Sequence, residues 1–196
     1  MAYNNQEIEL KLPLTKVQHQ RTKDKLTRIA KFVNFSHHVD DYFTPLRNSF
    51  LEAKYPFRWL TIRKRDGKTL LNYKHWYPEN TKYTTHCDEY ETEVSSSDQI
   101  ENILRSLGFK KFITVEKKRS VFSFKDELEI SLDEVKKLGY FIEIEVVKDF
   151  GNLDRARSNI LSFSRRLGFK RTRTVPGGYA AELMRKKGVL KFRRSK

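Results

Sequence analysis

Glu7-Ile8-Glu9-Leu10-Lys11 is the stretch of sequence that decides the fold. Charged and apolar residues alternate along it, which is typical of a β-strand whose two faces meet different surroundings. The two glutamates and the lysine share one face of this predicted strand, and the apolar residues share the other. Pro13 ends the strand, because proline cannot donate a ladder hydrogen bond.

The same two-residue period recurs along the chain and predicts further strands. They are expected at residues 37–43, 58–65, 69–77, 86–94, 112–124, 127–135 and 139–147. Asp66-Gly67 predicts a tight hairpin between two of them. Apolar residues at helical spacing predict helices at 16–33, from an N-cap at Ser97 to Gly108, at 153–167 and at 179–187. A short strand is predicted at 169–174.

The polar faces of these strands carry charges of both signs, which an ordinary solvated face does not require. The charged residues are Glu7, Glu9, Lys11, Arg63, Lys74, Glu89, Glu91, Glu93, Lys117, Arg119, Glu129, Asp133, Glu143 and Glu145. Two arrangements fit this pattern. Either the sheet is open and the charges meet water, or it closes with helices outside and charges inside. The pattern alone does not choose between them.

Composition limits the class of protein and its partners. The 196 residues carry a net charge of +15, with a pI near 9.8, so an anionic partner is expected. Cys87 is the single cysteine, which excludes an internal disulfide and fits a cytoplasmic protein. No apolar run approaches the roughly 18 residues of a membrane span, so no membrane partner is expected.

The order of the motifs resembles that of the CYTH superfamily, the triphosphate tunnel metalloenzymes. Glu-x-Glu-x-Lys stands at residues 7–11, and the other matching segments are 41–45, 59–63, 66–68, 71–74, 88–93, 114–119, 129–135, 138–145 and Gly178-Tyr179. The Lys-x-Arg strand at 117–119 is similar to that of the class IV adenylyl cyclases. The resemblance covers residues 5–185.

This resemblance implies an α+β fold, in which a closed antiparallel β-barrel of about eight strands forms a tunnel with helices packed outside. Residues 1–185 would form this CYTH-type domain, and residues 186–196 a basic tail. The charged faces would then line the tunnel. The resemblance also allows a homodimer.

The family's site residues carry over position by position. Glu7, Glu9 and Lys11 would be catalytic. Mg²⁺ or Mn²⁺ would be held by Glu7, Glu9, Asp133, Glu143 and Glu145. The phosphates would be held by Lys11, Arg63, Arg65, Lys74, Lys117 and Arg119, and further candidates are Glu91, Glu93 and Tyr179. Thr61 departs from the Arg-x-Arg of many relatives, and Arg65 lies on the same face to compensate for it.

Three functions remain open at this point. The leading one is conversion of ATP to cyclic AMP and pyrophosphate, as in class IV adenylyl cyclases. The second is hydrolysis of tripolyphosphate, thiamine triphosphate or a nucleoside triphosphate, since the same charged lining serves both reactions. The third is a noncatalytic module that binds polyphosphate or RNA. Nucleic acid would then contact the basic tail.

Overall fold

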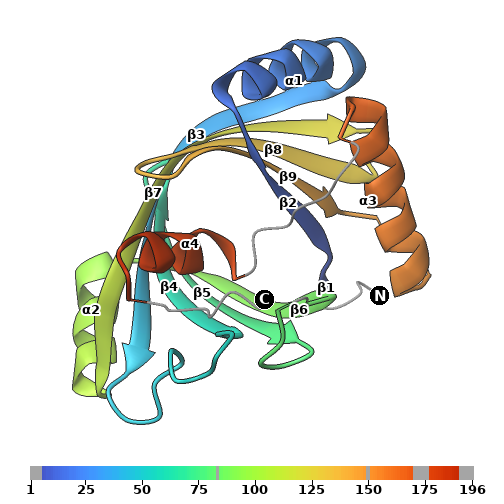
Figure 1. Ribbon diagram of the computed structural model, residues 1–196. Coiled ribbons are helices and arrows are strands. Elements are labelled where there is room, and N and C mark those ends of the chain that lie inside the picture. The colour runs from blue at the N-terminus through green and yellow to red at the C-terminus, as the bar shows by residue number, and fades with distance from the viewer. Residues whose placement is uncertain (1–5, 83, 149–150, 170–176, 190–196) are drawn as a thin grey trace. The chain divides into compact units, whose positions relative to one another are not determined.

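The computed structural model describes residues 6–82, 84–148, 151–169 and 177–189 (Figure 1). The chain divides into two compact units. Unit 1 comprises Met1–His37 and Lys117–Val175, and unit 2 comprises His38–Glu116 and Pro176–Lys196. Strands β3 (Lys31–Pro45) and β7 (Phe109–Phe124) run through both units.

Unit 1 contains an antiparallel sheet with the strand order β3-β7-β8-β9-β2. Strand β2 covers Glu9–Leu14, β8 covers Leu128–Val135 and β9 covers Gly139–Val146, while the short β1 (Gln6–Glu7) precedes β2. The pairing of β2 with β9 sets Lys11 opposite Glu143 and Glu9 opposite Glu145. This register brings the N-terminal motif next to a second Glu-x-Glu motif, Glu143-Ile144-Glu145 of β9.

Two helices cover the apolar face of the unit 1 sheet (Figure 1). Helix α1 (Lys16–Ile29) begins at Thr15, whose hydroxyl accepts from the Gln18 amide in a capping box. Helix α3 (Leu153–Leu167) ends at Gly168, which has a φ of 105° that glycine adopts without a Cβ penalty. Their buried side chains pack on the sheet residues, and this core comprises Leu10, Leu12, Leu26, Phe122, Leu128, Ile130, Leu132, Ile142, Ile144, Ile160, Phe163 and Leu167.

Unit 2 contains the strand order β6-β5-β4-β3-β7. Strands β4 (Arg58–Arg65) and β5 (Lys68–Tyr77) form the hairpin predicted around Asp66-Gly67, and β6 covers His86–Val94. Helix α2 (Ser97–Ser106) packs Leu104 against Phe43 and Ile62. Helix α4 (Gly178–Lys186) follows Gly177, whose missing Cβ leaves room for Ala181 and Trp59.

The α+β class and the antiparallel sheet are confirmed, and four local predictions require comment. Pro13 does not end its strand, since β2 continues to Leu14. Residues 30–33 are not helical, since α1 ends at Ile29 and Val33 lies exposed in β3. This aromatic and β-branched segment favours strand over helix. The N-cap of α2 is Ser96 rather than Ser97. The strand predicted at 169–174 falls largely outside the described residues.

Closure of the sheet into a barrel stays a prediction, as does the single domain 1–185. None of the described helices combines the length and the hydropathy that crossing a bilayer requires.

Candidate functional site

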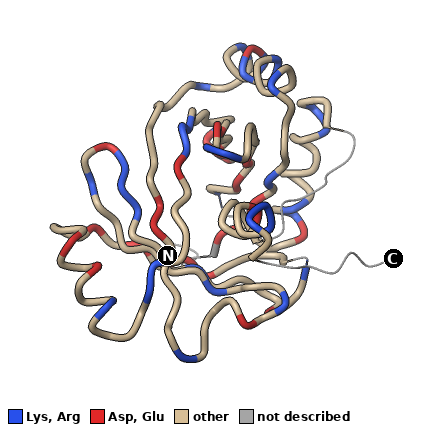
Figure 2. The backbone as a smooth tube through the Cα atoms, turned by 60° about the vertical axis from the view of Figure 1, so that its left-hand side comes forward, with Lys and Arg blue, Asp and Glu red and all other residues tan. Residues whose placement is uncertain are grey.

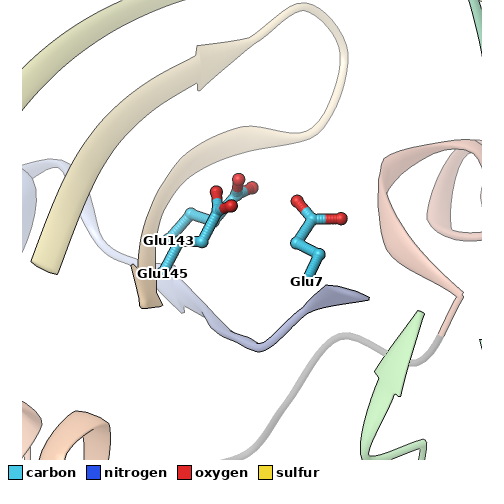
Figure 3. Close-up of side chains that lie close together, drawn as sticks. All are labelled: Glu7, Glu143 and Glu145. Atoms are coloured by element: carbon cyan, nitrogen blue, oxygen red, sulfur yellow. The ribbon is translucent and has the colours of Figure 1, made fainter. Parts of the chain in front are cut away.

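Three carboxylates converge in unit 1. Glu7, Glu143 and Glu145 each offer an oxygen that lies within 4.8 Å of the other two, and Figure 3 shows the three groups turned toward one another. Glu7 and Glu143 are each 5% exposed, so water screens their mutual repulsion poorly. In an octahedral Mg²⁺ site neighbouring oxygens lie about 3 Å apart and opposite ones about 4.2 Å apart. The three carboxylates are therefore near enough for a small divalent cation to draw them together, and all of their donors are the oxygens that Mg²⁺ and Mn²⁺ prefer.

Lys11 lies at the edge of this cluster and joins it to Glu9. Its Nζ contacts Glu9 Oε1 at 3.0 Å and Glu143 Oε2 at 2.9 Å. The first contact is within β2 and the second follows from the pairing of β2 with β9. Glu9 is not a member of the three-carboxylate group. The two glutamates of the N-terminal motif thus have different surroundings.

Arg119 holds the other side of Glu143. It donates through Nε and Nη2 to both oxygens of Asp133, at 2.8 and 2.7 Å, and Nη2 also contacts Glu143 Oε2 at 3.1 Å. The bidentate pair fixes the guanidinium plane, because Arg119 and Asp133 stand opposite each other on β7 and β8. Glu143 Oε2 is therefore shared by Lys11 and Arg119.

The charge state of Asp133 follows from these contacts. Its side chain is fully buried, and burial alone would raise its pKa. Arg119 and Lys117 outweigh burial and hold the pKa of Asp133 below its ordinary value. Lys117 is itself buried and lies two residues before Arg119 on the same strand. Asp133 is thus a charged anchor for the cations of unit 1.

The predicted cations of unit 2 are gathered by a second set of acids. Arg63 contacts Asp40 at 3.2 Å and Glu91 at 2.9 Å, while Arg65 contacts the other oxygen of Glu91 at 2.9 Å. Burial would lower the pKa of Arg63, but Asp40 and Glu91 raise it above its ordinary value. Arg65 and Arg63 therefore share one carboxylate, as their position on the same face of β4 predicts.

Three further residues of unit 2 belong to this network and were not among the predicted site residues. Asp40 is 2% exposed and holds Arg63. Asn72, also 2% exposed, donates to Glu89 and Glu91, at 2.5 and 3.2 Å, and Glu89 lies 3.4 Å from Lys74. A sequence signal existed for Asp40 and Asn72, since each lies on the charged face by strand alternation. Neither stood out, because aspartate and asparagine are common at strand ends and turns.

The remaining candidates lie at other places in unit 2. Glu93 pairs with Lys68 at 2.9 Å, and both side chains are more than half exposed, so this is a surface pair. Tyr179 is 4% exposed within α4. The Glu-x-Glu of β6 thus contacts basic side chains of β4 and β5.

Comparison with known proteins identifies the family. The family model for the CYTH domain matches residues 5–179. The chain is 25% identical over 175 residues to MJ0240 of Methanocaldococcus jannaschii, a protein named as a candidate adenylate cyclase. The match covers 88% of this chain and 95% of that protein.

Solved structures share the fold. The PH1012 protein of Pyrococcus horikoshii is 27% identical with a TM-score of 0.72, covering 89% of this chain and 98% of that one. HpAC1 of Hippeastrum, described as a candidate adenylyl cyclase with a dominant triphosphatase activity, is 20% identical with a TM-score of 0.64, covering 95% and 97%.

The chain belongs to the CYTH domain family, as the order of its sequence motifs indicates.

Proposed function

We propose that this protein is a metal-dependent enzyme that acts on a nucleoside triphosphate, and that it converts ATP to cyclic AMP and pyrophosphate. The convergence of Glu7, Glu143 and Glu145 beside Lys11 and Arg119 carries the proposal. Carboxylates that can hold a divalent cation stand next to cations that can hold phosphate. Phosphoryl chemistry requires this combination, because charge must be neutralised on both sides of the reacting phosphorus.

The predicted closed tunnel is part of this proposal. The cations proposed to bind phosphate are Lys11, Lys117 and Arg119 in unit 1, and Arg63, Arg65 and Lys74 in unit 2. Each of these cations already has a carboxylate partner or lies in a buried acidic setting, so the substrate phosphates replace or share those partners.

Each group has a defined task in the proposed reaction. Glu7, Glu143 and Glu145 hold Mg²⁺ or Mn²⁺, which when bound polarises phosphate oxygens and offsets charge on the leaving group. Asp133 fixes the guanidinium of Arg119 so that it keeps one orientation toward a phosphate. Glu9 positions Lys11 in the same way. This division gives Glu9 and Asp133 a positioning role.

The reaction itself needs alignment more than covalent help from the protein. The ribose 3′ oxygen bonds to the α-phosphorus while the bond from that phosphorus to the bridging oxygen of the β-phosphate breaks. Pyrophosphate leaves and the hydroxyl proton passes to solvent. The cations hold the triphosphate chain in line, which supplies the effective concentration of the hydroxyl.

The test is to incubate the protein with ATP and Mg²⁺ or Mn²⁺ and to separate the products. Cyclic AMP and pyrophosphate are expected. Glu7→Gln and Glu145→Gln should each lower turnover at least about a hundredfold, as loss of a group that orients charge in the transition state does. Glu134→Gln is the matched control, because Glu134 is an exposed carboxylate of β8. Equal activity of all three variants contradicts the assignment.

A second candidate function is triphosphate hydrolysis. It is favoured by the similarity to HpAC1, which is described as having a dominant triphosphatase activity. The same product separation distinguishes it, since ADP and phosphate from ATP, or rapid cleavage of tripolyphosphate, indicate hydrolysis. Binding of triphosphates with no turnover of any of them would instead indicate a noncatalytic module.

A further inference from the structure

The two helices of unit 1 carry an excess of positive charge that the proposed site does not use. Nine cations lie on them, namely Lys16, Arg21, Lys23, Lys25, Arg28, Arg155, Arg157, Arg165 and Arg166, against the two carboxylates of Asp24 and Asp154. The helices thus contribute +7 of the chain's +15. Figure 2 shows Lys and Arg positions along both helices.

These helix cations differ from those of the sheet in their partners. Lys11, Arg63, Arg65, Lys74 and Arg119 each form an ion pair with a carboxylate. Within the described part of the chain, none of the nine helix cations forms one. Eight of the nine are exposed, and Lys25 is half-buried. Unpaired exposed cations keep their full attraction for an external polyanion.

Five of these residues lie on one side of α1 or at the end of α3 that adjoins it, and we call them the cationic stripe: Arg21, Lys25, Arg28, Arg165 and Arg166. The first three are spaced four and three residues apart, so they share one side of α1. The ammonium group of Lys25 donates to the carbonyl of Arg166, which brings that side of α1 to the C-terminal end of α3. Arg28, Arg165 and Arg166 also stabilise helix C-termini, but Arg21 lies in neither last turn.

We propose that the cationic stripe binds the phosphate backbone of a nucleic-acid duplex. Arg21, Lys25 and Arg28 extend about 10 Å along the helix axis, and a duplex presents one charge per about 1.7 Å of its axis. Four of the five stripe residues are arginines, whose planar guanidinium groups match phosphate oxygens in pairs. The stripe thus has the charge density and the donor geometry of a backbone-binding surface.

The neighbouring side chains favour a duplex over other polyanions. Single strands are held by stacking bases on exposed aromatic rings. The exposed large apolar residues of α1 and α3 are Val17, Leu153 and Leu161, none of which is aromatic, and the exposed rings of Phe32 and Phe35 lie outside the stripe, on β3. A membrane surface takes up the apolar face of a helix, but the apolar faces of both helices are buried against the sheet through Leu26, Ile160 and other core residues. The regularly spaced phosphates of a duplex backbone, which do not depend on sequence, therefore match the stripe best.

The test is fluorescence anisotropy with a labelled duplex of about 20 base pairs, as RNA and as DNA, with 5′-hydroxyl ends. Such ends carry no triphosphate, so binding does not depend on the proposed enzymatic site. The logarithm of affinity should fall linearly with the logarithm of salt concentration. The triple variant Arg21→Gln, Arg28→Gln, Arg165→Gln should bind about eightfold more weakly at 0.1 M salt for each phosphate contact that it loses. The plot of log affinity against log salt concentration should become less steep by about 0.9 for each lost contact.

A matched control removes the same charge elsewhere. Arg47, Lys64 and Lys110 are exposed in unit 2. Apart from the effect of the lower net charge, changing all three to glutamine should leave the affinity for duplex within about twofold of that of the unaltered protein. Equal losses in both triple variants would overturn the proposal. So would no duplex binding at low salt, or binding to vesicles of anionic lipid that duplex does not compete away.

A measurement on the unaltered chain avoids any folding defect of the variants. Lysine acetylation with and without duplex should show protection of Lys25. Lys16 and Lys23 lie on the opposite flank of α1, by helical spacing, and should stay reactive. Uniform protection of all three, or of none, contradicts the stripe. Protection by the RNA duplex but not by the DNA duplex would show that the stripe binds the backbone of RNA.

Discussion

The buried pair of Arg119 and Asp133 predicts the largest effect of any single carboxylate in unit 1. Asp133→Asn removes a fully buried charge that accepts two hydrogen bonds, leaving Arg119 with Glu143 at 3.1 Å. Breaking one member of a buried ion pair costs about 3–5 kcal/mol. Retention of one amide oxygen as an acceptor places the expected loss near the lower end, at about 3 kcal/mol.

The pH dependence of this loss follows from the depressed pKa of Asp133. A carboxylate whose pKa is lower in the folded state stabilises the fold at a pH above its pKa in the unfolded state. This stabilisation is lost as the pH falls through the pKa of the folded state. The ordinary pKa of an aspartate side chain is 3.8. The difference between the unaltered protein and Asp133→Asn should therefore be full at pH 7. It should shrink as the pH falls below 3.8.

Amide hydrogen exchange of β8 and β9 is the appropriate assay, because it reports unit 1 by itself. Both tryptophans, Trp59 and Trp76, lie in unit 2 and would report that unit instead. Glu134→Gln, an exposed change on the same strand, is the control and should alter protection by less than about 0.5 kcal/mol. Protection in Asp133→Asn that stays within 1 kcal/mol of the unaltered protein at pH 7 (a difference well below about 3 kcal/mol) would refute the reasoning.

Three other perturbations test different parts of the molecule. Ile144→Ala removes a fully buried side chain from the unit 1 core and should cost about 2–5 kcal/mol by denaturant unfolding. Mn²⁺ at about a hundred times its Kd should stabilise the protein by about 2.7 kcal/mol in a thermal shift assay, and Glu7→Gln should remove most of that gain. Arg63→Gln leaves the 2% exposed Asp40 without its guanidinium partner, so turnover should fall and the KM for ATP should rise in steady-state kinetics.

Strand alternation predicted reliably which face of a strand a residue lies on, but not which residues it contacts. It predicted that Glu7, Lys11 and Glu143 belong to charged faces, and the structure brings the three together. The predicted strand 86–94 has the bounds of β6, and the helix 153–167 has those of α3. The extension of the first helix to residue 33 failed, because pairing of β3 within the sheet overrides local helical spacing.

The three Glu-x-Glu motifs, at residues 7–9, 91–93 and 143–145, show why partners could not be predicted. Glu143 and Glu145 of β9 stand opposite Lys11 and Glu9, so one cation serves several acids and Glu7 completes a metal-sized group. Glu91 of β6 stands opposite Asn72 and meets Arg63 and Arg65 instead.

The same Glu-x-Glu pattern therefore lies among an excess of carboxylates in unit 1, and among equal numbers of cations and acids in unit 2. What decides is the register of strands distant in sequence, which a local pattern does not contain. A divalent cation should bind where acids outnumber cations. Lys11→Gln should therefore strengthen Mn²⁺ binding in unit 1, because it removes the cation that shares Glu143. Isothermal titration should show a lower Kd, and an unchanged or higher Kd would mean that Lys11 and the metal do not compete for that carboxylate.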